Sequence, residues 1–150
     1  MSLLRVNAGI QISKPVNEVF EAIVDDKKMS NYFISESSGK MEEGKELLWK
    51  FPEYEERFPI KVLKIRMNEF VSYEWEMGEG KKNQVEMTLT AAPGNSTVVK
   101  ITEGEMENNE AGIAWLGGNA EGWANFLACL KAYLEYGINL RKGAFDFRKG

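Results

Sequence analysis

The side chain best suited to proton chemistry in this sequence is Glu103, near the end of a predicted strand. Val99 and Ile101 precede it at intervals of two residues, and side chains so spaced point to the same face of a strand. A carboxylate on a buried face needs hydrogen-bond partners, and such groups are typical acids and bases of enzyme sites. Glu103, or Tyr73 on another predicted strand, is therefore the candidate proton-transfer group of a cyclase or isomerase. The favoured interpretation is that Glu103 ends its strand at a solvated rim.

Other reaction chemistries are limited by the residues that the chain lacks. The sequence has no histidine, so it offers neither a Ser–His or Cys–His nucleophile pair nor a histidine-containing metal site. Cys129, the single cysteine, lies beside Phe126 and Leu130 on a predicted helix, which favours a packed apolar side chain over a reactive thiol. We expect no catalytic residue of these types, no metal and no cofactor, and a binding protein rather than an enzyme.

One acidic cluster and two glycine-rich stretches are candidates for ion or phosphate binding. Glu53, Glu55 and Glu56 gather in one predicted turn but lack the residue spacing of a calcium loop, so a solvated acidic loop is favoured. Gly78–Gly80 and Gly117-Gly118 lack the lysine or third glycine of a phosphate-binding loop. We predict that both glycine stretches are turns.

Aromatic side chains are the most informative group, because they concentrate on predicted inward faces. Pockets for small molecules are apolar with a few polar groups, whereas the same spacing also describes an ordinary filled core. We predict a cavity between a sheet and the last helix. Its predicted lining residues are Phe33, Trp49, Phe51, Phe58, Tyr73, Trp75, Met87, Glu103, Trp115, Trp123 and Leu127.

An antiparallel sheet has to hold most of these side chains. From Ser35 to Glu105 apolar residues alternate with polar ones, as in Leu47, Trp49 and Phe51, and turn residues separate the runs. Within Phe58–Arg66 the alternation changes phase, which predicts a bulge that bends the sheet. A bent sheet of this kind can wrap around a helix.

Helical periodicity occurs on both sides of the predicted sheet. After a strand over residues 4–12, a helix begins near Pro15, and Met29 and Tyr32 suggest a second short helix. The apolar face of the first helix consists of Val16, Val19, Phe20 and Ile23. The last helix is predicted from a cap at Asn119 to about Arg141, long enough to cross the sheet. The tail from Ala144 lacks periodicity and is predicted to be loose.

Length and composition limit the class of protein. The 150 residues are predicted to form a single domain, residues 1–150. A net charge of −4 argues against a nucleic-acid partner, and no apolar stretch is long enough for membrane insertion. The N-terminal residues have polar side chains where a signal peptide has an apolar core, and one cysteine suits a reducing compartment. We therefore expect a cytoplasmic protein.

Three stretches resemble the START-like, birch-pollen-allergen-like (SRPBCC) superfamily. Ile12–Ile23 is similar to its opening, and Lys27–Phe33 to the segment that follows, with Tyr32 where a tryptophan is usual. Gly122–Gly137, with the sequence GWANFLACLKAYLEYG, resembles the ending of one family within it. That family is related to the C-terminal domain of the activator of the heat-shock-protein-90 ATPase. Its best-understood members carry an additional N-terminal domain, for which we expect no room here.

This resemblance implies an α+β helix-grip fold. A curved antiparallel sheet of about six or seven strands would wrap around a long C-terminal helix, with one or two short helices after strand 1. The implied function is a small-molecule binding module, with a cavity for an apolar or amphipathic ligand between sheet and helix. The alternatives are a chaperone-associated interaction protein and a cavity enzyme of cyclase or isomerase type. The expected partners are an apolar small molecule or a chaperone, and the expected assembly is a monomer or homodimer.

Overall fold

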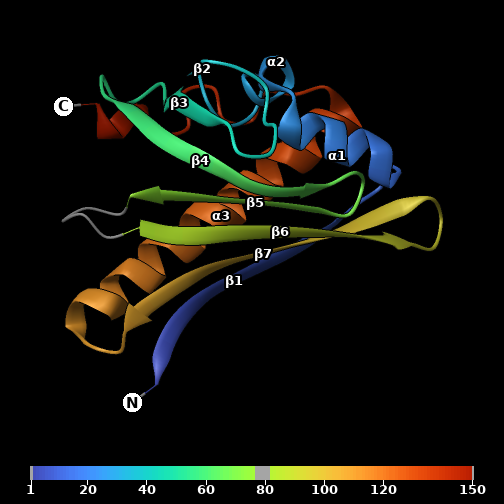
Figure 1. Cartoon of the computed structure of the whole chain (residues 1–150). Helices are drawn as coiled ribbons and strands as arrows, with labels where there is room; N and C mark the ends of the chain where they lie inside the picture. Colours follow the sequence, from blue (N-terminus) through green and yellow to red (C-terminus); the bar gives the residue numbers. More distant parts are fainter. Residues whose placement is uncertain (1, 77–81, 150) are drawn as a thin grey trace.

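A computed structural model describes residues 2–76 and 82–149, and it shows one curved antiparallel sheet with a long helix along one face (Figure 1). Among these residues the sheet has seven strands in the order β1-β7-β6-β5-β4-β3-β2. They are Leu3–Ile12 (β1), Glu36–Ser37 (β2), Glu46–Lys50 (β3), Arg57–Arg66 (β4), Phe70–Glu76 (β5), Lys82–Ala92 (β6) and Ser96–Glu107 (β7). The helices are Val16–Val24 (α1), Asp26–Met29 (α2), Glu110–Tyr136 (α3) and a 3-10 turn, Asp146–Arg148. The predicted helix-grip architecture is confirmed.

The sheet is built on the predicted alternation of buried and exposed side chains. In β3, Leu47 and Trp49 are buried against the core, whereas Leu48 is exposed on the other face. The pairing of β4 with β5 shifts register between Val62 and Lys64, which confirms the predicted bulge. Because a bulge bends the strand that carries it, the sheet curves around the apolar core.

Two short helices close one end of the sheet. In α1, Val19, Phe20 and Ile23 are buried, as their spacing predicts. The Asp25 side chain then accepts hydrogen bonds from the backbone N–H groups of Lys27 and Lys28 and so caps α2. This helical pair brings the residues that follow, including Phe33, against the sheet.

The prediction for the last helix was wrong at both ends. α3 begins after Asn109, whose side chain accepts a hydrogen bond from the Gly112 N–H, and not after Asn119. Gly117-Gly118 therefore lies inside the helix and is not a turn. A helical glycine costs only about 1 kcal/mol relative to alanine. Trp115 and Leu116, in the turn before the two glycines, are half-buried against the core. This packing stabilises the helix through Gly117 and Gly118.

The helix ends earlier than predicted, and the tail is attached to the body of the protein rather than loose. Gly137 adopts the left-handed conformation with φ of 66° and stops α3 after Tyr136, because glycine reaches this region without steric cost. Residues 138–149, here called the C-terminal segment, turn back along α3 (Figure 1). Arg141 and Arg148 attach the segment to the body of the protein through ion pairs.

Two further observations concern features raised by the sequence. Gly78–Gly80, predicted to be a turn, lies outside the described residues. Within the described residues, none of the helices is both long and apolar enough to cross a membrane.

Candidate functional site

A cleft of about 590 Å³ lies between α3, the connection from β3 to β4 and the C-terminal segment. Its inner wall is aromatic and consists of Phe33, Phe51, Phe58, Trp75, Trp123 and Phe126. The face that α3 presents to it consists of Gly118, Asn119, Gly122, Asn125 and Cys129. Glu53, Arg141, Phe145 and Arg148 line the side at the C-terminal segment, here called the mouth. The cleft is therefore a mostly apolar space with charged groups at its mouth and two asparagines on α3.

Two helical glycines help to keep the cleft open. Gly118 and Gly122 are four residues apart on α3 and so lie on the same face. A Cβ built on either of them would have no heavy atom within 4 Å. Larger side chains at these positions would therefore occupy open space beside the cleft. The backbone of α3 itself thus forms part of the wall.

Glu103 lies behind the aromatic wall and organises it. Its side chain is fully buried and accepts three hydrogen bonds. Trp75 Nε1 donates over 3.0 Å, Asn119 Nδ2 over 2.9 Å and Trp123 Nε1 over 2.8 Å. The interpretation that Glu103 ends its strand at a solvated rim is therefore wrong, because three donors from β5 and α3 take the place of water.

These hydrogen bonds fix the orientation of the Trp75 and Trp123 rings. Both N–H edges point to Glu103, and the ring centroids of Trp75 and Trp123 are 5.8 Å apart with a tilt of 34°. Phe33 continues this wall, with its ring edge-on to Phe51 at 5.2 Å and to Phe126 at 4.6 Å. Edge-to-face and tilted contacts of this kind hold aromatic rings in defined orientations. The result is a rigid apolar surface rather than a set of mobile side chains.

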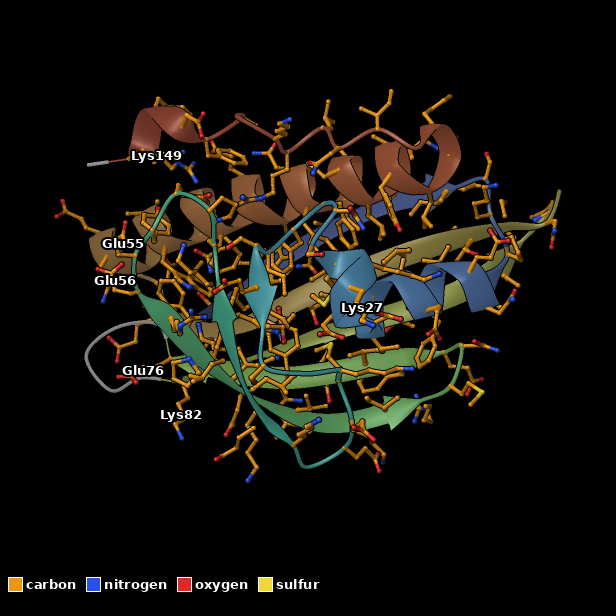
Figure 2. The ribbon with its side chains drawn as sticks, turned by 90° about the horizontal axis from the view of Figure 1, so that it is seen from above. Lys27, Glu55, Glu56, Glu76, Lys82 and Lys149 are labelled. Carbon is orange, nitrogen blue, oxygen red and sulfur yellow. The ribbon has the colours of Figure 1, made fainter. Side chains whose placement is uncertain are left out.

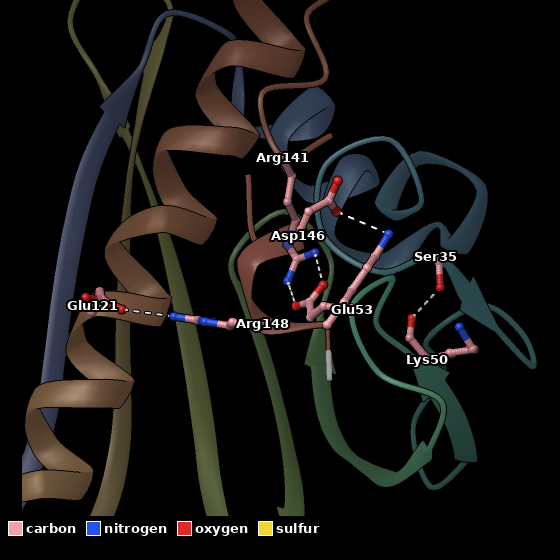
Figure 3. Close-up of polar contacts among 8 residues, drawn as sticks. Ser35, Lys50, Glu53, Glu121, Arg141, Asp146 and Arg148 are labelled. Carbon is pink, nitrogen blue, oxygen red and sulfur yellow. Dashed lines mark hydrogen bonds and ion pairs between the residues drawn. The ribbon is translucent and has the colours of Figure 1, made fainter. Parts of the chain in front are cut away.

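The mouth of the cleft is closed on one side by a buried ion pair (Figure 3). Arg141 of the C-terminal segment donates to both carboxylate oxygens of Glu53, over 2.7 and 3.0 Å. Desolvation raises the pKa of Glu53, but the hydrogen bonds and charge of Arg141 outweigh it and hold this pKa below its ordinary value of 4.5. The Arg141 guanidinium also lies 5.5 Å from the Phe51 ring centre and 4.9 Å from that of Phe145. The C-terminal segment is thereby joined to the β3–β4 connection.

The acidic cluster of the sequence is divided by the fold. Glu53 is buried and paired, which corrects the expectation of a solvated loop at that position. Glu55 and Glu56 are exposed, and Figure 2 shows them along the same edge of the molecule as Glu76 and Lys149. Among residues 2–76 and 82–149, no group of three acidic or cysteine side chains is placed to hold a metal ion.

The residues predicted to line the cavity separate into two groups. Phe33, Phe51, Phe58, Trp75 and Trp123 line the cleft. Trp49, Tyr73, Met87 and Leu127 are buried in the core beneath it, Glu103 is behind the wall, and Trp115 is half-buried against the core. Strand and helix spacing identify an inward face, but they do not distinguish the side chains at an open edge from those sealed inside.

Several cleft residues were missed by the sequence analysis. Arg141, Phe145 and Arg148 come from a segment that was predicted to be loose or to end the helix. Asn119 was taken as a helix cap and instead donates to Glu103. The tail has no apolar periodicity, and its two arginines beside two phenylalanines were the one signal that could have indicated a docked segment.

Two buried polar groups lie close to this wall without taking part in its hydrogen bonds. Trp49 Nε1 and the Tyr73 hydroxyl have no hydrogen-bond partner among the described residues. Burial, and then the nearby Glu103, raises the pKa of Tyr73 well above its ordinary value of 10.0. The Tyr73 hydroxyl therefore stays protonated at neutral pH.

Cys129 lines the cleft but is a poor nucleophile. Burial raises the pKa of its thiol above the ordinary value of 9.0, against a smaller opposing effect of Arg141. Because the thiolate is the reactive form, we expect iodoacetamide to modify the native protein at pH 8 at least about tenfold more slowly than free cysteine. Mass spectrometry of timed samples measures this rate, and unfolded protein is the control. Modification as fast as in the unfolded control would show that the thiol is accessible and that its pKa is not raised.

Residues 13–135 match the family model described as activator of Hsp90 ATPase homolog 1-like protein. The chain belongs to this family. The resemblance predicted from the sequence is thereby confirmed. No curated protein matches the chain.

Solved structures share the fold over nearly the whole chain. A protein from Staphylococcus saprophyticus is 28% identical, with a TM-score of 0.79 over 90% of this chain and 94% of that one. A protein of the dynemicin biosynthetic locus is 26% identical with a TM-score of 0.78, over 90% of this chain and 48% of its own. The Aha1 dimer from Colwellia psychrerythraea is 21% identical, with a TM-score of 0.77 over 89% and 98% of the two chains.

Proposed function

We propose that this member of the activator of Hsp90 ATPase homolog 1-like family binds an apolar or amphipathic small molecule in the cleft. The observation that carries the proposal is the aromatic space of about 590 Å³ between α3 and the β3–β4 connection. Sites for small molecules are concave, mostly apolar and about 300–1,000 Å³ in volume. The cleft has this size and a mostly apolar lining, with a few polar groups among the residues that line it.

The residues that line the cleft support a ligand-binding role and argue against a simple packing defect. An unfilled methyl-sized gap in a core costs about 1 kcal/mol, so folding alone favours larger side chains facing such a space. Here α3 instead presents Gly118 and Gly122, and helical glycine is itself unfavourable by about 1 kcal/mol. Glu103 meanwhile holds two indole rings at the edge of the space instead of letting them collapse into it.

The glycines provide a test with a matched control. N-Phenyl-1-naphthylamine, a neutral fluorescent probe, should bind the protein with a dissociation constant on the order of micromolar. Gly122→Leu places a side chain in the cleft and should weaken binding by at least about tenfold. Gly117→Leu lies outside the lining, has equal space around its Cβ, and should bind the probe as the wild type does. Both variants should melt at a higher temperature, because leucine favours helix over glycine.

The combined readout separates blocked binding from damaged folding. A loss of probe binding in Gly122→Leu with a raised melting temperature supports the proposal, since the fold is then intact. Absence of saturable probe binding to the wild-type protein would refute it. Equal weakening in Gly122→Leu and Gly117→Leu would also refute it, because binding would then lie elsewhere.

Contact with a chaperone is the second candidate, and the family description supports it. The matching family is named for activators of the Hsp90 ATPase, and one structural neighbour carries the name Aha1. Calorimetric titration of an Hsp90-type chaperone with the purified chain tests this candidate directly. Saturable heat with wild-type protein and with Gly122→Leu alike would favour a chaperone contact outside the cleft.

A further inference from the structure

Two guanidinium groups line the cleft, and their hydrogen-bonding states differ. Arg141 is almost fully buried, and both of its terminal nitrogens donate to Glu53, so its charge is already neutralised. Arg148 donates one hydrogen bond, to Glu121 over 3.2 Å (Figure 3). An arginine carries five N–H donors. Among the described residues that line the cleft, Arg148 is therefore the arginine with more free donors and the less fully compensated charge.

The Arg148 ion pair is also easy to exchange. The side chain of Arg148 is 36% exposed and that of Glu121 is 64% exposed, and Glu121 does not line the cleft. Exposed pairs of this kind contribute only about 0–1 kcal/mol, because water and dissolved ions screen them. Replacing Glu121 with another anion would therefore cost little.

Aromatic contacts orient this guanidinium. The Arg148 Cζ lies 4.5 Å from the centre of the Phe145 ring and 5.4 Å from that of Phe147. Stacking of this kind restrains a guanidinium while leaving its N–H edge available to planar anions. Phe145 itself lines the cleft, so the stacked pair belongs to the mouth of the site.

Three acidic groups near the cleft bear on which ligand charge is favoured. Glu53 is paired with Arg141 through two hydrogen bonds, with a smaller electrostatic contribution from Arg148, and Glu103 is separated from the space by the indoles that donate to it. Glu76 lines the opposite wall at the end of β5 and has an interaction of its own. The paired and covered acids leave Arg148 as the group that can engage a ligand charge directly.

We propose that the ligand of the cleft is an amphipathic acid, whose anionic group pairs with Arg148 while its apolar part lies against Trp75 and Trp123. This inference rests on the proposed function, and it adds the class of ligand. Carboxylates and sulfonates fit the fork of a guanidinium, and the aromatic wall suits a planar ring system. The Arg148–Glu121 pair is the resting state that the ligand anion replaces.

Two probes with the same ring system test the charge requirement. 8-Anilinonaphthalene-1-sulfonate is an anion, and N-phenyl-1-naphthylamine is its neutral counterpart. Arg148→Met should weaken binding of the anionic probe by up to about fivefold, the upper end for one partly exposed ion pair, and leave the neutral probe unchanged. Glu121→Gln removes the same ion pair but keeps the guanidinium, so the anionic probe should bind at least as tightly as to the wild type.

Each outcome separates this inference from the proposed function. If neither probe binds the wild-type protein, both proposals fail. If both bind but Arg148→Met weakens both equally or neither, the cleft binds ligands and Arg148 does not select an acid. The inference would also be overturned if Glu121→Gln weakened binding of the anionic probe as much as Arg148→Met does. The ion pair would then act only by holding the C-terminal segment in place.

Discussion

Replacing Glu103 with leucine should lower the free energy of unfolding by at least about 3 kcal/mol. The substitution leaves the donors of Trp75, Asn119 and Trp123 without their shared acceptor. Each buried donor without a partner costs about 1–3 kcal/mol, and the indole N–H groups cannot turn to water without moving their rings. The effect should therefore exceed that of point substitutions in general, which are centred near 1 kcal/mol.

Glu103→Gln is the matched control for this prediction. The glutamine amide keeps the shape of the side chain and one accepting oxygen but presents an N–H₂ group where an oxygen accepted before. We expect an intermediate loss of about 1–3 kcal/mol, the cost of one unsatisfied donor. Urea unfolding followed by circular dichroism gives both values, and tryptophan emission reports the exposure of Trp75 and Trp123. A leucine variant as stable as the wild type would show that these hydrogen bonds do not hold the wall.

Arg141→Met should destabilise the C-terminal segment by up to about 3–5 kcal/mol. The Glu53 side chain is 3% exposed, so loss of its partner leaves a carboxylate buried without compensation. The segment can relieve this penalty by lifting away, which limits the loss to the free energy of its own docking. Hydrogen exchange of residues 138–149 should then accelerate while exchange in the sheet stays unchanged. If exchange of this segment stayed slow in Arg141→Met, the remaining contacts of the segment would be sufficient to keep it docked.

The same ion pair predicts a dependence on pH. A carboxyl group with a depressed pKa in the folded state stabilises the protein above its unfolded pKa, and the contribution is lost as pH falls through the folded pKa. For Glu53 this loss begins near its ordinary value of 4.5 and continues below it. The difference in segment exchange between wild type and Arg141→Met should therefore be full at pH 7 and shrink below about pH 4.5.

The comparison between variants isolates this titration from others. Hydrogen bonds from Lys131 and from the Ser13 backbone lower the pKa of Glu135, so acid weakens that contact as well. Because Glu135 is present in both proteins, its contribution cancels in the difference. If the difference in segment exchange between wild type and Arg141→Met stayed constant down to pH 3, Glu53 would be excluded as the titrating group.

Local patterns in the sequence were sufficient to predict the sheet, the first helix and the aromatic character of the site. Alternation with a period of two is a property of neighbouring residues, so Leu47, Trp49 and the phase change in β4 could be interpreted without tertiary information. The same patterns placed Trp75 and Trp123 on facing elements. They also supplied the motifs by which the family was predicted, since those motifs follow the strands and helices of the fold.

The polar organisation of the site arises only from contacts between distant residues. Glu53 and Arg141 are 88 positions apart, and Glu103 meets donors on both β5 and α3. Whether a carboxylate is solvated or buried depends on such partners and not on its sequence neighbours, so both glutamates were misjudged as exposed. Helix propensity likewise placed a break at Gly117-Gly118, whereas packing of α3 against the sheet continues the helix through it and leaves Gly118 beside an open cleft.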